Sequence, residues 1–348
     1  MECSKCGREA VMHAAYSGSH LCEKHFRRSL ERRVRRRIRE DGLVPDHATP
    51  DDPDRWLIGL SGGKDSVVLT QILAETFSED PRIELLALTI HEGIEGYRDE
   101  SLSASLDLTD ELGIRHEVVH YEEEFGVRMD DVAEKDPVGM SPCAYCGVFR
   151  RDLLEEYAAE LDADKLLTGH NLDDEAQTAL MNVLEGDVRQ IAKHFDASLG
   201  PFDERTIAAG DDGDAGCAGD GNADEARQRR EKQETFVPRA KPLRDVPEKE
   251  VALYAHLREL PAHITECPHA SEAYRGEIQS LLQNLEENHP GTRHSILSGY
   301  EELASLAAQR YDGAGDDRVE LSECERCGSS TSDDVCRKCR LLEAVEGA

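Results

Sequence analysis

An alternation of short apolar runs and helical stretches constrains the fold of this chain more than any other feature. The first run, Trp56–Leu60, leads through a glycine loop into a helical stretch at 67–77. Further apolar runs, each alternating with a helical stretch, occur at 83–91, 116–122 and 165–171. This order is typical of an α/β fold with a doubly wound, mostly parallel sheet. Ligands of such sheets bind beyond the carboxyl ends of the strands, so we expect the site there.

The loop between the first strand and the first helix has the composition of a phosphate site. Its two glycines let the backbone approach an anion, while successive N–H groups, the helix N-terminus and a lysine supply positive charge. These residues are Ser61, Gly62, Gly63, Lys64, Asp65 and Ser66. The spacing differs from the GxxxxGK of Walker loops, which disfavours ordinary kinases and GTPases. We predict a phosphate cradle; the alternative is a glycine turn without a ligand.

All but one of the 11 cysteines fall in clusters, and the chain begins without the charged and apolar segments of a secretory signal. CxxC pairs in such a chain indicate metal or redox sites rather than disulfides. One set at each end supplies four ligands, which suits structural zinc better than incidental thiols. The two sets are Cys3, Cys6, Cys22 and His25, and Cys324, Cys327, Cys336 and Cys339. We predict two zinc modules, each too small to fold on its own core.

Two further constellations lie between the ends. Cys143 and Cys146 form a CxxC pair in PCAYCGVFRR, and Cys267 follows in TECPHASEAYRG. The string GHNLDDEAQTALMN carries Asp173 and Asp174, whose carboxylates suit a magnesium ion or the orientation of a target base. The alternative for these aspartates is a helix N-cap, and both roles can coexist.

The charge balance is strongly acidic except in one helix. The net charge is -32, arginine predominates among the basic residues and aromatic residues make up 5%, a balance that resembles proteins from salt-in halophiles. An acidic protein that avoids nucleic acid would look the same. Residues 26–40, by contrast, combine a dense basic face with an apolar stripe, formed by Phe26, Leu30, Val34 and Ile38. We predict that this helix contacts RNA phosphates; the alternative is helix solubility or ion pairing with acidic neighbours.

Composition divides the chain into six segments. They are an N-terminal zinc module (1–26), the basic helix with a Pro- and Asp-rich linker (27–50), the nucleotide-binding core (51–202), an acidic flexible insertion (203–235), the remainder of the catalytic domain (236–312), and a linker with a C-terminal zinc ribbon (313–348). The insertion is rich in Gly, Asp and Ala, so it cannot bury much, and we interpret its Cys217 as incidental. No apolar run is long enough to span a membrane, so we expect a soluble, cytoplasmic protein.

The glycine loop SGGKDS resembles that of the PP-loop ATP pyrophosphatase superfamily, which adenylates a carbonyl or carboxyl oxygen and releases pyrophosphate. Together with the cysteine strings and GHNLDDEAQTALMN, it resembles the tRNA 2-thiouridine synthetases of the two-thiouridine thiolase group, which also carry a zinc module at each end. The resemblance covers nearly the whole chain apart from the insertion and the linkers. The strings GVFRR, KPLRDVPEKE and TECPHASEAYRG are more similar to the branch that acts on the anticodon wobble uridine than to the T-loop branch.

The resemblance implies a set of ATP ligands. Residues 61–66 would bind the phosphates of ATP, and Asp65 would help to organise magnesium. Gly169 and His170 stand with the two aspartates at the end of a predicted strand, where they could face the nucleotide. Some relatives place a lysine soon after the CxxC pair, where this chain has Arg150 and Arg151. Because arginine keeps its proton, we expect Arg150 to stabilise charge rather than to transfer a proton.

The resemblance also implies a 4Fe-4S cluster held by Cys143, Cys146 and Cys267, with one iron left open. Three thiolates are one short of the four that saturate such a cluster, so the vacant iron could bind sulfide. Two alternatives stay open. One is persulfide chemistry on two of the cysteines, and the other is a further zinc ion completed by His269.

The expected function is therefore ATP-dependent 2-thiolation of a tRNA uridine. The 2-carbonyl oxygen attacks the α-phosphate of ATP, and sulfur then replaces the adenylated oxygen. Expected partners are tRNA, a second copy of the chain in a homodimer, and a ubiquitin-like carrier ending in a thiocarboxylate or inorganic sulfide. A PP-loop ligase acting on a small carboxylate would not explain the three cysteines. A non-catalytic zinc-and-RNA scaffold is disfavoured because Lys64, Asp65 and Ser66 are intact.

Overall fold

The computed structural model describes residues 1–135, 138–188, 190–192, 237–265, 267–269, 274–312, 322–331 and 333–347. The predicted insertion at 203–235 with its Cys217, and the predicted linker that follows residue 312, lie outside the described residues. Within the described ranges no helix combines the length and the apolar character needed to cross a membrane.

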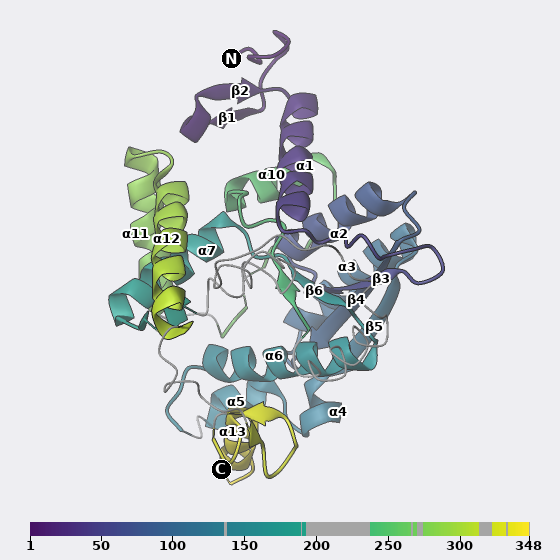
Figure 1. Ribbon diagram of the computed structural model, residues 1–348, viewed down its shortest axis with the longest axis vertical. Coiled ribbons are helices and arrows are strands. Elements are labelled where there is room, and N and C mark those ends of the chain that lie inside the picture. The colour runs from purple at the N-terminus through teal and green to yellow at the C-terminus, as the bar shows by residue number, and fades with distance from the viewer. Residues whose placement is uncertain are drawn as a thin grey trace, which may run out of the picture.

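A five-stranded sheet lies at the centre of the molecule, in the order β5-β4-β3-β6-β7 and with every neighbouring pair parallel (Figure 1). Its strands are β3 (Asp54–Gly59), β4 (Ile83–His91), β5 (Arg115–His120), β6 (Lys165–Thr168) and β7 (Arg239–Ala240). Trp56 and Ile58 face one core and Leu57 faces the other, because successive side chains of a strand point to opposite faces. The predicted parallel α/β architecture is confirmed. The edge strand β7 was not predicted, because 2 residues are too few to show periodicity.

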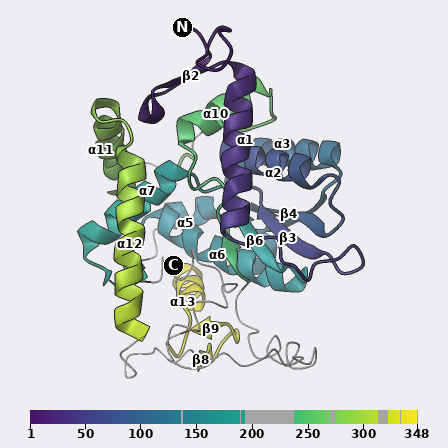
Figure 2. The same ribbon diagram turned by 45° about the horizontal axis from the view of Figure 1, so that its top comes forward.

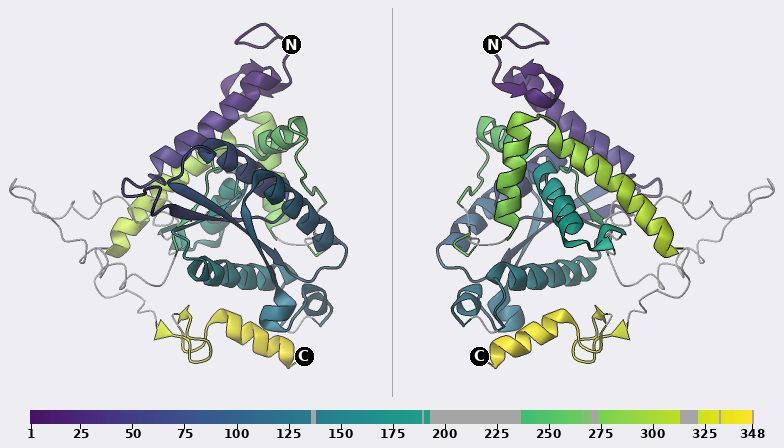
Figure 3. Two further views of the ribbon diagram at one scale, coloured as in Figure 1. Left: turned by 90° about the vertical axis from the view of Figure 1, so that its right-hand side faces the viewer. Right: turned by 90° about the vertical axis from the view of Figure 1, so that its left-hand side faces the viewer.

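Helices cover both faces of the sheet (Figure 3). The core that contains Trp56 is shared by α1 (Glu23–Glu40), α2 (Lys64–Phe77) and α10 (Glu248–Leu257), with α3 (Tyr97–Leu112) beside α2. The core that contains Leu57 is shared by α4 (Tyr121–Phe125), α5 (Met129–Lys135) and α6 (Pro142–Glu160). To one side, three helices pack together: α7 (Leu172–Glu185), α11 (Tyr274–Asn288) and α12 (Thr292–Asp312) (Figure 2).

Small modules at the two termini lie at opposite ends of the molecule (Figure 1). The first is an antiparallel hairpin of β1 (Met12–Ala14) and β2 (Ser19–Leu21), joined by the 3-10 turn η1 (Ala15–Ser17), and it leads directly into α1. The second pairs β8 (Ser322–Glu323) with β9 (Ser330–Thr331) and continues into α13 (Arg337–Glu346). Leu341 and Val345 of α13 are buried in the same core as residues of α6, so this module is attached to the α/β domain through α13.

Candidate active site

The glycine loop lies where β3 ends and α2 begins, between α3 and the turn after β6. Gly62 has a φ of +76°, and a Cβ there would lie 2.2 Å from the backbone oxygen of Ser101, so only glycine fits. A Cβ on Gly169 would lie 2.8 Å from the backbone nitrogen of Ser66. The hydroxyl of Ser66 accepts a hydrogen bond from the Ser61 N–H at 3.2 Å and donates one to the Gly63 oxygen at 3.0 Å. The loop is therefore held in shape by its own side chains and by two close backbone contacts.

A cavity of about 320 Å³ opens beside this loop, beyond the carboxyl ends of β3, β4 and β6. We call it the nucleotide cavity. The residues predicted to face ATP that line it are Ser61, Asp65, Ser66, Gly169, His170 and Asp174. Apolar side chains, including Leu88 and Ile90, form another part of its wall. A pocket with an apolar wall at one side and a loop of N–H groups at the other suits a nucleotide base and its phosphates.

Lys64 points away from the nucleotide cavity. Its Nζ lies 2.7 Å from the Glu248 carboxylate and 3.1 Å from that of Asp65, and it lines a separate cavity with Glu248 and Asp173. Burial works to lower the pKa of Lys64, but the two carboxylates outweigh it and raise the pKa. Lys64 therefore stays charged, held between Glu248 and Asp65.

Asp173 and Asp174, adjacent in the chain, face different surroundings. Asn171 is the N-cap of α7, and its side chain accepts hydrogen bonds from the N–H groups of both aspartates. The carboxylate of Asp174 lies at the nucleotide cavity and accepts a hydrogen bond from Arg275 at 2.9 Å. Asp173 is buried, where its carboxylate accepts the Glu248 N–H at 2.8 Å and pairs with Arg293 at 3.0 Å. Of the two, only Asp174 lines the nucleotide cavity.

The structure brings the three central cysteines to one cavity, also of about 320 Å³, which we call the cysteine cavity. Cys143 and Cys146 lie one turn apart in α6, and Cys267 arrives from the segment that follows the Gly63–His263 bridge. Burial raises the pKa of all three thiols, and Arg150 opposes this effect at Cys143 and Cys146. The guanidinium of Arg150 lies 3.2 Å from the sulfur of Cys146.

Metal-ligand geometry distinguishes the cysteine cavity from the terminal modules. Four ligands on a tetrahedral zinc ion, with bonds of about 2.3 Å, lie roughly 3.8 Å apart. Among the described residues, two groups have ligand atoms that all lie within 4.8 Å of one another: Cys3, Cys6, Cys22 and His25, and Cys324, Cys327, Cys336 and Cys339. The central trio is not such a group, and His269 binds Asp130 at 2.7 Å instead of joining it. The wider trio fits a cluster better than a single ion.

Three charged residues that line the nucleotide cavity, Glu92, Arg98 and Arg275, were missed by sequence reasoning. Glu92 follows β4 directly, and Arg98 lies in the first turn of α3. Arg98 pairs with Glu92 and donates a hydrogen bond to the Ser61 backbone oxygen at 2.9 Å, while Arg150 pairs with Glu92 at 2.6 Å. The signal available was the position of Glu92 at a strand's carboxyl end, in the string HEGIEGYRDE.

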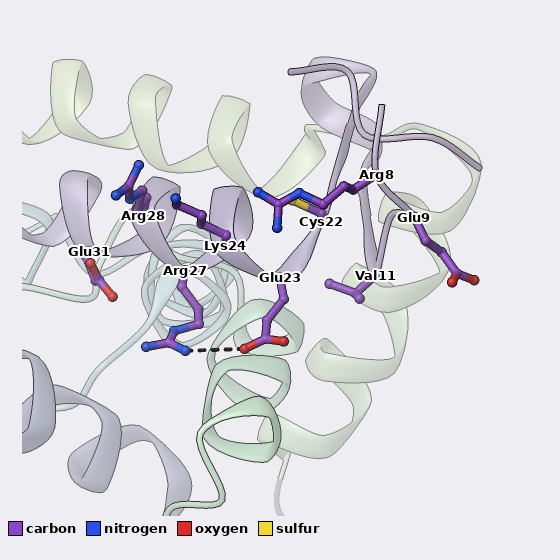
Figure 4. Close-up of a pocket in the computed structure, with 9 residues that line it drawn as sticks. All are labelled: Arg8, Glu9, Val11, Cys22, Glu23, Lys24, Arg27, Arg28 and Glu31. Atoms are coloured by element: carbon purple, nitrogen blue, oxygen red, sulfur yellow. Dashed lines mark hydrogen bonds and ion pairs between the residues drawn. The ribbon is translucent and has the colours of Figure 1, made fainter. Parts of the chain in front are cut away.

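The basic helix divides into two faces. Phe26, Leu30, Val34 and Ile38 are buried, and Arg33 and Arg37 form ion pairs with Glu250 and Asp245. The opposite face exposes basic residues one turn apart, which are Lys24, Arg28, Arg32 and Arg36. At the N-terminal end of this face lies a hollow of about 670 Å³. Figure 4 shows Arg8, Lys24 and Arg28 around it, whereas Arg27 turns to Glu23.

A glycine phosphate loop at the carboxyl edge of a parallel sheet, next to a cysteine cavity, defines a nucleotide-binding α/β protein of the PP-loop class. The family model of the PP-loop domain matches residues 29–198, and that of the N-terminal LIM domain of 2-thiouridine synthetase TtuA matches residues 2–27. The tRNA 2-thiolation protein NcsA of Haloferax volcanii is 68% identical over 346 residues, which are 99% of either chain. The chain belongs to the tRNA 2-thiolation protein family.

More distant relatives support the same family assignment. The cytoplasmic tRNA 2-thiolation protein 1 of Malassezia globosa is 36% identical, and the match covers 99% of this chain and 87% of that protein. The solved structure of the U34-tRNA thiolase NcsA from Methanococcus maripaludis, with its [4Fe-4S] cluster, is 33% identical with a TM-score of 0.74. That likeness covers 99% of this chain and 96% of the other. The resemblance to the wobble-uridine branch agrees with these relatives.

Proposed function

We propose that this chain is an ATP-dependent enzyme that adenylates the 2-carbonyl oxygen of a wobble uridine in tRNA and replaces that oxygen with sulfur. One observation carries the proposal: the nucleotide cavity and the cysteine cavity adjoin, and Ser61, Arg98 and Arg150 line both. A base placed at this junction lies within reach of ATP on one side and of the cysteines on the other. The U34-tRNA thiolase to which the chain is similar supports the choice of base.

Adenylation is assigned to the glycine loop and the turn after β6. The N–H groups of the loop and the N-terminus of α2 bind the phosphates, and Lys64 adds a charge after it leaves Glu248. Carboxylate oxygens are the ligands that Mg²⁺ prefers, and Asp65 and Asp174 both line the nucleotide cavity. The uridine oxygen attacks the α-phosphate, pyrophosphate departs, and the new O–P bond makes that oxygen a leaving group.

Sulfur transfer is assigned to the cysteine cavity. Cys143, Cys146 and Cys267 would hold a 4Fe-4S cluster, which supplies an open iron able to carry sulfide. Arg150, between Cys146 and the nucleotide cavity, stabilises the negative charge that collects on the phosphate as AMP departs. The sulfur source is a thiocarboxylate carrier or inorganic sulfide.

The terminal modules and α1 are assigned to tRNA binding and to structure. Each module would hold one zinc ion, because its four ligand atoms lie within 4.8 Å of one another. The exposed stripe Lys24, Arg28, Arg32 and Arg36, with the hollow beside it, offers positive charge to RNA phosphates on an otherwise acidic protein. We infer that tRNA crosses this face. We also infer that two copies of the chain form a homodimer, and light scattering tests this oligomeric state.

Mass spectrometry of tRNA nucleosides from a deletion strain tests the function. We expect 2-thiouridine to disappear from the wobble position and to return with the wild-type gene. Loss from the T-loop instead would overturn the choice of base, and unchanged thiouridine would overturn the function. Exchange of labelled pyrophosphate into ATP separates the remaining classes. A tRNA-dependent exchange is expected, tRNA-independent exchange would indicate a small-molecule ligase, and no exchange would indicate a scaffold.

A further inference from the structure

Two arginines lie at the junction of the two cavities, and one buried carboxylate holds them both. Glu92 has no exposed surface, and its backbone oxygen accepts the Met129 N–H at 2.9 Å. A carboxylate at that depth is costly unless it is paired, and here two guanidinium groups pair with it. Although burial alone would raise the pKa of Glu92, Arg150 and Arg98 hold it below its usual range, so the group is charged.

We propose that Glu92 is a positioning residue that fixes Arg98 and Arg150 between the nucleotide cavity and the cysteine cavity, so that both arginines face the phosphate of the adenylated base. The inference rests on the proposed function, because the phosphate concerned is the one that adenylation attaches to the uridine and that sulfur transfer releases as AMP. Two guanidinium groups and one carboxylate leave a net positive charge at the junction. Charge of that sign, fixed in advance, stabilises the anion that each step develops.

Each arginine also touches the machinery of one step. Arg98 is almost fully buried and holds the glycine loop through the Ser61 backbone oxygen at 2.9 Å. The guanidinium of Arg150 contacts Glu92 at 2.6 Å and the Cys146 sulfur at 3.2 Å. A continuous line of contacts therefore runs from the loop, through Arg98, Glu92 and Arg150, to a cysteine of the trio.

Removal of the carboxylate charge has a different consequence for each arginine. Arg98 keeps its buried place, with Ser61 and Ser101 as partners, but becomes a buried charge without a counter-ion. The side chain of Arg150 is 43% exposed, and among the described residues Glu92 and Cys146 hold its guanidinium at the junction. The two arginines would also repel each other once the carboxylate between them is neutral.

The substitution Glu92→Gln tests this arrangement, because it keeps the shape and removes the charge. We expect tRNA-dependent pyrophosphate exchange, measured on cluster-free protein, to fall by about 10- to 100-fold, with the KM for ATP nearly unchanged. Single-turnover thiolation by iron-loaded protein should fall by a similar factor. Arg98→Lys should slow mainly the exchange and Arg150→Met mainly the thiolation. Adding Arg150→Met to Glu92→Gln should not slow thiolation further, because the two residues act as one unit.

Val119→Ala is the matched control, since it weakens the core that contains Leu57 and Val119 lines neither of the two cavities. Glu92→Gln rates within about twofold of wild type, or rates that fall only as far as in a control of equal Tm, would overturn the proposal. Arg98→Lys keeps Glu92 and every charge, so it decides the matter if Glu92→Gln does not fold. A wild-type protein without exchange or thiolation would instead overturn the proposed function.

Discussion

The terminal modules and the cysteine cavity use the same side chain to build two kinds of site. In the C-terminal module the sulfur atoms of Cys327 and Cys336 lie 3.6 Å apart, and those of Cys324 and Cys339 lie 3.9 Å apart. All four ligands come from one short stretch with its own hairpin and helix start. In the cysteine cavity one helix supplies two sulfurs and a distant segment supplies the third. The first arrangement has the spacing of the ligands of a single ion, whereas the second is wider, as a cluster requires.

The causes of the thiol pKa shifts also differ between the C-terminal module and the cysteine cavity. N–H groups of the C-terminal module, led by that of Cys336, lower the pKa of Cys324 to about 6, while burial raises that of Cys339. In the cysteine cavity burial raises the pKa of every thiol, and the opposing charge comes from arginines of the active site, Arg150 at Cys143 and Cys146 and Arg98 at Cys267. In the C-terminal module, therefore, groups of the module itself lower the pKa of one of its ligands. In the cysteine cavity, the pKa values of the thiols depend on side chains of the surrounding active site.

The largest effect should follow from Cys267→Ala. Loss of one of three thiolates should remove iron entirely, and thiolation should fall by more than about 100-fold, because even the outer partners of a metal ligand cost up to that factor. Metal in the two terminal modules, which we propose to be zinc, should stay bound, since the terminal ligand sets share no residue with the trio. Metal analysis and nucleoside analysis measure the two results.

Cys217→Ala provides the matched control, because we interpret that cysteine as incidental and it changes the same atoms. It should keep the iron, the zinc and the activity of wild type. Wild-type iron in the Cys267→Ala protein would contradict the cluster ligands, and loss of zinc would contradict the separation of the two kinds of site.

The neighbouring aspartates give the next effect. Asp174→Asn removes a carboxylate from the nucleotide cavity, so pyrophosphate exchange should fall by about 100-fold. Asp173→Asn removes the negative charge that pairs with Arg293 and leaves one oxygen where the carboxylate used two, so it should lower Tm by several degrees and change exchange little. Thermal unfolding and exchange, measured on both variants, decide between them. Equal losses of exchange at equal Tm would show that both carboxylates serve the nucleotide.

The sequence predicts a region well when the residues that form it are close together in the chain, and poorly when they come from distant elements. Strand and helix alternation is a local signal, and so is the spacing of four metal-ligating side chains, so the sheet and both terminal ligand sets could be predicted. The pairing of Arg98 and Arg150 through Glu92 joins three elements, and no local pattern encodes it. The same limit applies to Asp173 and Asp174, because the contacts of Asp173 with α10 and α12, which hold it outside the nucleotide cavity, join distant parts of the chain.

A moderate effect should follow from loosening the C-terminal module. Leu341 of α13 is buried against the core of α6, which carries Cys143 and Cys146, and Lys338 pairs with Asp152 of α6. Leu341→Ala should cost about 2 to 5 kcal/mol of local packing, so α13 should detach more readily and iron should be lost faster in chelator. Leu303→Ala, at a side chain that is 52% exposed on α12, is the control and should retain iron like wild type. Equal iron loss in both variants would mean that the module does not support α6.

The smallest effect should come from the basic helix, where the two faces of α1 can be separated. Replacing Arg28, Arg32 and Arg36 with Ser removes exposed charge, so tRNA should bind more weakly. The slope of log affinity against log salt concentration should become shallower by about 2 to 3. Each lost phosphate contact reduces the slope by slightly less than one, and the variant loses three such contacts. In concentrated salt the loss of affinity itself should be only a few-fold, because screening already weakens these contacts.

Arg33→Ser is the control for this helix, because its guanidinium pairs with the buried Glu250 and also donates to Tyr16. It removes the same kind of charge from the opposite face, so it should lower Tm and leave the salt slope as in wild type. Filter binding of tRNA over a salt series measures the slopes. An unchanged slope in the triple variant would remove α1 from the tRNA surface, and a changed slope in Arg33→Ser would mean that its ion pair opens when tRNA binds.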